Sequence, residues 1–178
     1  MTEFATLYGN SLYALAQQEN IEARIYADLE FVGMQFKAQP DYVKLLDAPM
    51  VTLQEKCELL DAAFKAHLHP YTCNFLKLLA EKKQMHAFAY ARQVYTDKYN
   101  EANNIEPAVA VTAVPLSARL QEKLTDKLSK MTGKTIVLEN KVDPHILGGL
   151  TIRMANRQVD ASVRSRLNAL EKQLSERW

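Results

Sequence analysis

The sequence predicts a mainly α-helical protein with a small α/β part, and three observations lead to that class. Apolar residues recur at helical spacing in the first half of the chain and alternate with polar residues in parts of the second half. All 8 Tyr and all 6 Phe lie at or before Tyr99, after which Trp178 is the only aromatic residue. Residues 1–105 carry 10 Lys and Arg against 13 Asp and Glu, a net charge of −3, whereas residues 106–178 carry 12 against 8, a net charge of +4. We therefore expect two domains, residues 1–105 and residues 106–178, that meet just after Asn103.

The bulk properties are those of an ordinary globular protein, with 178 residues, a net charge of +1 and 48% hydrophobic residues. The start, Met1-Thr2-Glu3, lacks the pattern of a secretory signal, and the longest weakly polar run, residues 107–116, is shorter than a membrane span. Cys57 and Cys73 form no CxxC pair, so a reducing, cytoplasmic compartment suits them. We expect any membrane association to go through a partner.

Six helices with short connections, and hence a bundle, are predicted for the first domain. After the first helix, a second has one apolar face at helical spacing, formed by Ile21, Ile25, Leu29, Val32 and Phe36. A short third helix over residues 42–46 lies between Pro40 and Pro49, which break the chain on either side. A fourth helix begins after the capping box of Thr52 and Glu55. Its expected apolar stripe is Leu53, Cys57, Leu60 and Phe64.

Pro70 suits the first turn of a fifth helix that runs to about Lys82, and a sixth helix ends near Asn103. The first and fifth helices are unusual because they are apolar nearly all round. Their polar residues fall on narrow stripes, Thr6, Asn10 and Gln17 in the first helix and Asn74, Lys77 and Glu81 in the fifth. Such a helix is buried on more than one side. It is either a central helix of the bundle or one that buries one face and offers another to a partner helix, and both interpretations stay open.

The second domain is predicted to follow the order β-α-β-β-β-α. Its strands are expected over residues 108–114, 134–142, 150–154 and 157–160. Ser117 can cap the intervening helix and Gly133 can end it. The apolar face of that helix is expected to be Leu120, Leu124, Leu128 and Met131. The last helix is marked by Val163, Leu167, Leu170 and Leu174.

No segment carries the pattern of an active site, and we expect no catalytic residue, no cofactor and no metal. Thr132-Gly133-Lys134-Thr135 ends like a phosphate-binding loop, but Leu128 stands where that motif needs glycine, and the preceding segment is helical. Gly148-Gly149 lacks the rest of a dinucleotide-binding fingerprint, which favours a turn or bulge with close backbone contact. His67 and His69 have no third ligand at a suitable spacing, so a solvated pair is favoured over a metal site.

The basic second domain raises the question of nucleic-acid binding. Its arginines at positions 153, 157, 164, 166 and 177 are able to contact phosphates. RNA-binding sheets, however, stack bases on aromatic side chains, and residues 106–177 contain none. We therefore favour a solvated face, or a patch for an acidic protein partner, over nucleic acid.

The C-terminal part contains, in order, Asp143-Pro144, residues 147–153 (LGGLTIR) and residues 156–164 (NRQVDASVR), followed by Leu167 and Leu170. This stretch closely resembles the C-terminal signature of the ATP synthase delta subunit family, which includes the mitochondrial oligomycin-sensitivity-conferring protein. The resemblance extends to nearly the whole chain through Thr112-Ala113, Pro115-Leu116-Ser117, Thr132-Gly133-Lys134, residues 74–76 and 79–81, and the opening Tyr8, Leu12 and Leu15-Ala16. Two positions depart from the family pattern, Gly9 in place of the frequent alanine and Lys82-Lys83 in place of Asn/Gly-Arg.

The resemblance implies a non-catalytic stator subunit in the peripheral stalk of an F-type ATP synthase. The helical domain would bind N-terminal helices of alpha subunits at the top of the catalytic head, and the C-terminal domain would bind the b subunits. The protein would thereby resist rotor torque and couple ion transport to ATP synthesis. It would lie on the cytoplasmic face of the bacterial cell membrane, attached only through the b subunits.

The resemblance also indicates which residues carry these contacts. The alpha-binding groove is expected between the first and fifth helices, at Tyr8, Leu12, Leu15, Asn74 and Leu78. The signature residues expected to be structural are Gly148, Gly149, Asp160, Ser162 and Arg164. Asp160 and Ser162 are expected to cap the last helix.

Two other classes of function remain as alternatives. One is an RNA- or ribosome-associated adaptor, which salt-dependent binding of nucleic acid by the basic domain would support. The other is an enzyme with an unrecognised site, which would require turnover by the isolated chain.

Overall fold

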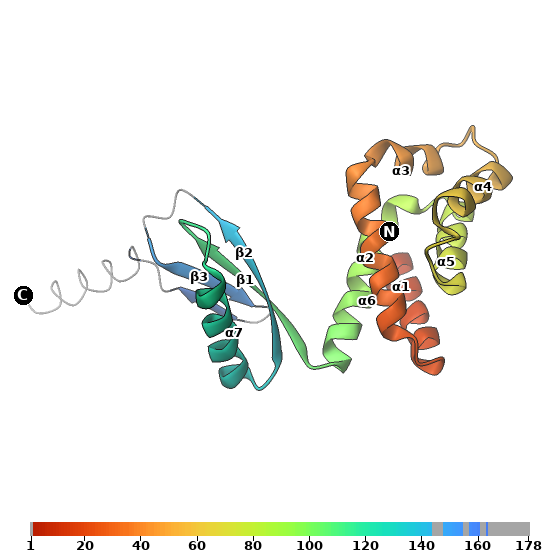
Figure 1. Ribbon diagram of the computed structural model, residues 1–178. Coiled ribbons are helices and arrows are strands. Elements are labelled where there is room, and N and C mark those ends of the chain that lie inside the picture. Colours follow the sequence, from red (N-terminus) through yellow and green to blue (C-terminus); the bar gives the residue numbers. More distant parts are fainter. Residues whose placement is uncertain (1, 144–147, 155–156, 161–162, 164–178) are drawn as a thin grey trace, which may run out of the picture. The chain divides into compact units, whose positions relative to one another are not determined.

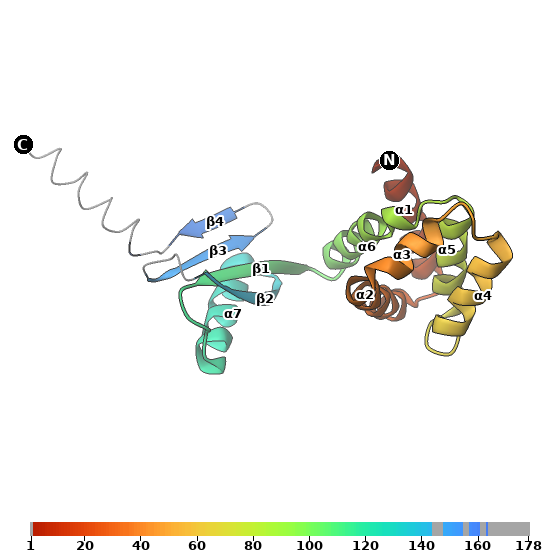
Figure 2. The ribbon, with the colours of Figure 1, turned by 90° about the horizontal axis from the view of Figure 1, so that it is seen from above.

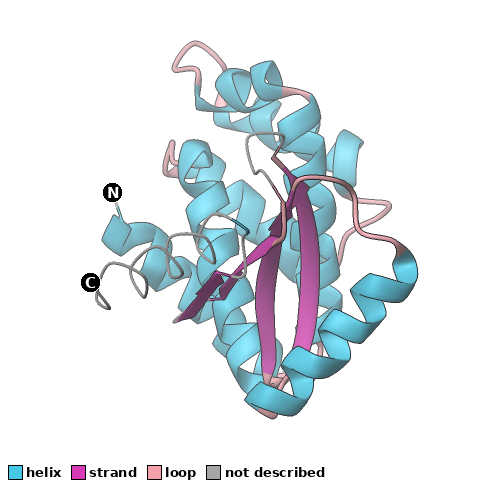
Figure 3. Cartoon of the chain, turned by 90° about the vertical axis from the view of Figure 1, so that its left-hand side faces the viewer, coloured by secondary structure: helices cyan, strands magenta, loops and turns pink. Residues whose placement is uncertain are grey.

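The computed structural model describes residues 2–143, 148–154, 157–160 and 163 (Figure 1). The chain divides into two compact units, Met1–Asn100 and Glu101–Trp178. Each unit has its own cluster of buried apolar side chains. The first is helical, and the second contains every strand that the structure describes (Figure 3).

The helices of the first unit pack around one core. They are α1 (Thr2–Gln18), α2 (Glu22–Ala38), α3 (Pro40–Asp47), α4 (Leu53–Phe64), α5 (Pro70–Glu81) and α6 (Phe88–Ala102), with a 3-10 turn, η1 (Met85–Ala87), before the last of them (Figure 1). The fully buried side chains of this core include Ile25, Leu29, Leu46, Leu76, Leu79 and Tyr95. The predicted apolar face of α2 is confirmed, with its first residue half-buried and the other four buried.

The start of α4 shows both a confirmed prediction and a wrong one. The capping box is present: the Glu55 backbone N–H donates to Thr52 Oγ1 at 3.3 Å, and the Thr52 N–H donates to Glu55 Oε2 at 2.9 Å. The predicted stripe is wrong at Leu53, whose side chain is 47% exposed. Leu53 is the first residue of α4, and the buried face of the helix follows Lys56, Leu60 and Phe64 at a spacing of four residues instead.

The second unit contains a mixed sheet of four described strands, β1 (Ile105–Thr112), β2 (Thr135–Val142), β3 (Leu150–Met154) and β4 (Arg157–Asp160). Their order in the sheet is β2-β1-β3-β4. β1 pairs in parallel with β2 and antiparallel with β3, and β3 pairs antiparallel with β4. Between the parallel strands runs α7 (Ala118–Thr132), which supplies the crossover that such a pair requires and lies on one side of the sheet (Figure 2).

The core of the second unit lies between α7 and the sheet, where Ala108, Leu128, Ile136 and Ile152 are buried. Gly133 ends α7 in the left-handed conformation, with φ of 72°, as the sequence predicts. The predicted apolar face of α7 is only partly correct. Leu124 and Leu128 pack on the core, but Leu120 is 55% exposed and Met131 is 63% exposed, because the core is shorter than the helix that covers it.

Asn140 fixes the segment that joins β1 to α7. Its Oδ1 accepts the Leu116 backbone N–H at 3.0 Å. Its Nδ2 donates to the Ala110 carbonyl oxygen at 3.0 Å and to Thr112 Oγ1 at 2.9 Å. The Thr112 hydroxyl in turn donates to the Val114 carbonyl oxygen at 2.7 Å. One side chain on β2 thereby satisfies polar groups of a strand and of the loop after it.

The predicted class, mainly α with a small α/β part, is confirmed, although the strand bounds differ. β1 begins at Ile105, earlier than predicted, because the Thr135 N–H donates to the Asn104 carbonyl oxygen at 2.9 Å and so starts the β1–β2 ladder there. Pro107 fits within β1 because pairing with β3 begins only at Ala108. Apart from Val163, the predicted last helix lies outside the described residues, so the full order of the module stays a prediction.

Candidate functional site

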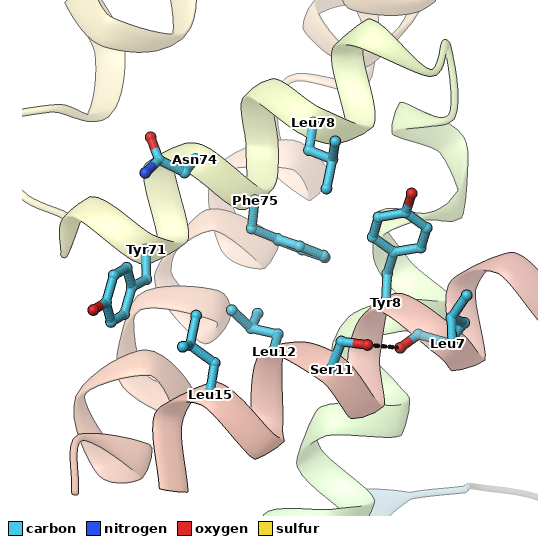
Figure 4. A pocket seen from close by; sticks show the side chains of 9 residues that line it. All are labelled: Leu7, Tyr8, Ser11, Leu12, Leu15, Tyr71, Asn74, Phe75 and Leu78. Carbon is cyan, nitrogen blue, oxygen red and sulfur yellow. Dashed lines mark hydrogen bonds between the residues drawn. The ribbon is translucent and has the colours of Figure 1, made fainter. Parts of the chain in front are cut away.

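An apolar groove with a volume of about 510 Å³ lies open between α1 and α5 (Figure 4). We call it the α1–α5 groove. Its lining consists of nine side chains, Leu7, Tyr8, Ser11, Leu12 and Leu15 from α1 and Tyr71, Asn74, Phe75 and Leu78 from α5. None of the nine is charged, and most of the lining atoms are apolar.

The groove has a buried floor and an exposed rim. Leu12 and Phe75 form the floor, and each is only 6% exposed because both also belong to the core of the first unit. On the rim, Leu7 is 63% exposed and Leu15 is 37% exposed. Large apolar side chains left in water beside a preformed cavity are typical of a surface that a partner covers.

α1 is held in place on its other side by close contact with α6. Gly9 is buried, and a Cβ built on it would lie 2.8 Å from the Ala91 carbonyl oxygen and 3.0 Å from the Val94 Cβ. Only a residue without a side chain permits this approach. Gly9 therefore has a structural role, since it lets α1 sit against the α6 backbone.

α5 is held at its N-terminus by a carboxylate of α2. Asp28 is 4% exposed, and its Oδ2 accepts the His69 backbone N–H at 2.7 Å and the Thr72 hydroxyl at 3.1 Å. Its Oδ1 lies 3.2 Å from Arg24 Nε, and the same guanidinium donates to the His67 carbonyl oxygen at 2.7 Å. A negative charge at a helix N-terminus is favourable, because the unpaired N–H groups there carry partial positive charge.

Two further contacts fix the rest of α5. Lys77 Nζ lies 2.7 Å from the Asp61 carboxylate of α4, and this hydrogen bond raises the pKa of Lys77. At the C-terminal end, the Gln84 N–H donates to the Leu79 carbonyl oxygen and the Lys83 N–H to the Ala80 carbonyl oxygen, at 2.9 and 3.1 Å. Lys83 adopts a left-handed φ of 54° to close this cap. The groove wall formed by α5 is thus fixed at both ends.

The polar groups of the groove are few and neutral. They are the hydroxyls of Tyr8, Ser11 and Tyr71 and the amide of Asn74. The Ser11 hydroxyl donates to the Leu7 carbonyl oxygen at 2.8 Å, so it is satisfied within α1 (Figure 4). Because its lining is uncharged and mainly apolar, the groove suits apolar contact.

The structure brings together all five residues that the sequence analysis proposed for the groove. Leu12 lies on its floor, Tyr8 and Leu78 are half-buried, and Leu15 and Asn74 are exposed. Their binding to a partner helix stays a prediction. Sequence reasoning missed four lining residues, Leu7, Ser11, Tyr71 and Phe75. Three of them, Ser11, Tyr71 and Phe75, lie three or four residues from a proposed one, which was the available signal, whereas Leu7 has no such spacing.

The C-terminal signature residues are only partly described. Gly148 and Gly149 have φ of 155° and 85°, values that favour glycine. The Gly148 carbonyl oxygen accepts the Val163 N–H at 3.0 Å, and a Cβ on Gly148 would lie 3.2 Å from Val163 Cγ2, so close backbone contact occurs as predicted. Asp160 ends β4 and accepts a hydrogen bond from Thr151 Oγ1 at 3.4 Å. Ser162 and Arg164 lie outside the described residues, and the predicted capping of the last helix is untested.

The described part of the chain contains no group of three or more His, Cys, Asp or Glu side chains arranged to hold a metal ion. His69 instead caps α5, accepting the Tyr71 N–H on Nδ1 at 3.3 Å, and the His67 ring packs at 6.2 Å from Phe31. None of the helices within the described ranges is long and apolar enough to cross a membrane.

Comparison with known proteins gives one consistent result. The family model described as "ATP synthase delta (OSCP) subunit" matches residues 4–174. The chain is 34% identical over 173 residues to "ATP synthase subunit delta" of Clostridioides difficile, covering 97% of this chain and 96% of that protein. It is 31% identical over 175 residues to the protein of the same name from Lactobacillus johnsonii, covering 98% and 96%. Among solved structures, a chain of the Toxoplasma gondii mitochondrial ATP synthase hexamer superposes with a TM-score of 0.74 at 26% identity, covering 96% of each chain.

Proposed function

Because the chain belongs to the ATP synthase delta (OSCP) subunit family, we propose that it is the stator subunit that links the catalytic alpha/beta head of an F-type ATP synthase to the membrane-anchored b subunits. In this role it resists the torque of the rotor and so couples ion translocation to ATP synthesis. It catalyses nothing itself. It lies at the cytoplasmic face of the bacterial cell membrane, attached through the b subunits.

The observation that carries the head-binding part of this proposal is the α1–α5 groove. Its uncharged, mainly apolar lining and exposed Leu7 and Leu15 suit the apolar face of an amphipathic helix. We propose that the N-terminal helix of an alpha subunit occupies it. Residues 1–105 have a net charge of −3, which favours a helix whose outer face is basic. Because the lining itself is uncharged, we expect apolar burial to provide most of the affinity.

For the second unit we propose the b subunits as partner. Residues 106–178 have a net charge of +4 and contain no aromatic residue before Trp178. This combination supports an acidic protein partner and speaks against base stacking on the sheet.

The test of the whole assignment is co-purification from gently solubilised membranes. The chain is expected to be recovered together with alpha, beta and b subunits. Recovery of the intact synthase without this chain, or of this chain without those subunits, would contradict the stator assignment.

The test of the groove uses a synthetic peptide with the N-terminal sequence of the alpha subunit. Leu7→Asp and Leu78→Asp are expected to weaken binding of this peptide by about tenfold or more, since a charge in an apolar contact is strongly unfavourable. Met34→Asp on α2 is the matched control, because Met34 is 60% exposed and does not line the groove. Leu12→Asp is less informative, because Leu12 is buried and its replacement would unfold the first unit. Normal peptide binding by folded Leu7→Asp and Leu78→Asp chains would show that the groove is not the site.

A further inference from the structure

Four cations form a line along the exposed side of α7. They are Arg119, Lys123, Lys127 and Lys130, and all four side chains are exposed. Their spacing of four, four and three residues places them on one side of a helix. We call this line the α7 cation stripe.

The charges of the stripe are not neutralised within the described part of the molecule. No ion pair or hydrogen bond joins any of the four side chains to another described side chain, whereas nearby Lys134 lies 3.4 Å from Glu106 Oε2. Glu122 and Asp126 occupy the neighbouring edge of α7 and leave the stripe unpaired. Four unpaired cations with only two carboxylates beside them give this side of α7 a positive potential.

Each cation of the stripe is followed in the sequence by an apolar residue. Two of these four apolar residues are packed on the core and two are exposed. The inner two, Leu124 and Leu128, pack on the core of the second unit. The outer two, Leu120 and Met131, are 55% and 63% exposed. Consecutive residues lie about 100° apart around a helix, so the exposed apolar pair borders the stripe on the side nearer the sheet. α7 thus presents two exposed apolar side chains, Leu120 and Met131, next to a row of positive charges, and we call this pair the apolar shoulder.

We propose that this side of α7, the cation stripe with Leu120 and Met131, is the surface through which the second unit binds the stalk, and that its occupant is an acidic amphipathic helix of a b subunit. The inference rests on the proposed function, which names the partner but not the surface. An amphipathic helix satisfies both features, because its apolar residues cover the shoulder while its carboxylates pair with the stripe. A nucleic-acid backbone would satisfy only the charges and leave both apolar side chains in water.

The binding test uses the full-length chain and the purified extramembrane part of the b subunits from the same complex. Lys123→Glu and Lys127→Glu are each expected to weaken binding by about tenfold and to make it less dependent on salt. Lys141→Glu is the matched control: it changes the net charge equally, but Lys141 lies on β2 and pairs with Glu139 at 3.8 Å. Leu120→Asp is expected to weaken binding, whereas Val137→Asp, at a β2 position that is 57% exposed, is expected to leave it unchanged.

The two binding surfaces should also differ in their response to salt. Binding of b through the stripe is expected to weaken steeply as ionic strength rises, whereas binding of the alpha peptide to the uncharged groove is expected to change little.

The outcomes separate this inference from the proposed function. If the unaltered chain binds b and the stripe variants bind equally well, the surface is wrong while the stator role stands. If Lys141→Glu weakens binding as much as Lys123→Glu, the effect is one of net charge and the assignment to α7 is overturned. If the unaltered chain does not bind b, both fail. If the stripe variants bind b normally but lose binding to a single-stranded RNA oligonucleotide, the stripe is a nucleic-acid surface and the inference is overturned.

Discussion

Asp28 Oδ2 in α2 accepts a hydrogen bond from Thr72 Oγ1 in α5 at 3.1 Å, and the two residues are 44 positions apart in the sequence. The same oxygen accepts the His69 N–H. Neither Asp28 nor Thr72 lines the α1–α5 groove, yet their contact fixes the start of the helix that forms one of its walls. The shape of the groove therefore depends on a buried polar contact behind it.

Replacing Asp28 is expected to destabilise the first unit. Asp28→Ala should lower the free energy of unfolding by about 3 kcal/mol, because it leaves buried donors without their charged acceptor. Thr72→Val, which keeps the shape and removes one donor, should lower it by only about 1 kcal/mol. Urea denaturation followed by circular dichroism measures both. Equal denaturation midpoints for Asp28→Ala and the unaltered chain would show that the contact contributes nothing.

Gly9 and Gly33 should respond differently to alanine. Alanine in place of helical glycine ordinarily stabilises by about 0.5–1 kcal/mol. At Gly9 the new Cβ would meet the Ala91 carbonyl oxygen, which is backbone and cannot yield, so Gly9→Ala should instead destabilise by about 1–3 kcal/mol. At Gly33 it would meet the guanidinium of Arg92, the far end of a long side chain that has several rotatable bonds and lies 3.5 Å from Glu30 Oε2. Gly33→Ala should therefore be near neutral, and calorimetric melting of the two variants compares them directly.

The C-terminal cap of α5 offers a stabilising change. Lys83 has φ of 54°, a conformation that costs a residue with a side chain about 1 kcal/mol and costs glycine almost nothing. Lys83→Gly is therefore expected to raise the free energy of unfolding by up to about 1 kcal/mol. Lys82→Gly is the control, since Lys82 has an ordinary helical φ of −77° and glycine there should destabilise. A lower melting temperature for Lys83→Gly would contradict the expectation.

Tyr95 links stability to alkaline pH. Its hydroxyl donates to the Glu22 carbonyl oxygen at 3.0 Å, and burial raises its pKa above the ordinary value of 10.0. Above about pH 10 the unfolded tyrosine loses its proton while the folded one keeps it, so the folded chain binds more protons and stability falls as pH rises. Tyr95→Phe should lower the free energy of unfolding by about 1 kcal/mol at neutral pH. It should also reduce the decrease in that free energy that occurs as the pH rises from about 9 to about 11.

Melting temperatures measured across that range test the prediction. Tyr26 and Tyr42 also have raised pKa values, caused mainly by burial, so Tyr95→Phe should reduce the alkaline loss without abolishing it. Tyr90→Phe is the control, because Tyr90 is 46% exposed. An alkaline loss as large in Tyr95→Phe as in the unaltered chain would show that Tyr95 does not contribute to it.

Local signals in the sequence were sufficient for the features that depend on neighbouring residues. The capping box of Thr52 and Glu55, the proline at the start of α5 and the left-handed Gly133 after α7 are all present as predicted. Each depends on backbone groups within one helical turn, so the residues that determine it are adjacent in the sequence.

Features that depend on tertiary packing were not predictable in the same way. Leu12 and Leu15 are three residues apart on the same apolar helix, yet one is 6% and the other 37% exposed, because only the first belongs to the core of the first unit. The bond between Asp28 and Thr72 has no local pattern at all. The sequence could therefore indicate which helices have excess apolar surface, but it could not determine which of their residues face solvent.

The central position of β1 would have a mechanical consequence in the proposed stator role. β1 follows the first unit directly in the chain, so tension between the two units would reach the second unit through this strand. It is paired at eight positions with β2 on one side and at five with β3 on the other. Pulling along the strand acts across these hydrogen bonds together, in shear, whereas an edge strand pulled sideways loses its bonds one at a time. In the proposed role, the strand that would receive this tension is therefore one that is paired on both sides.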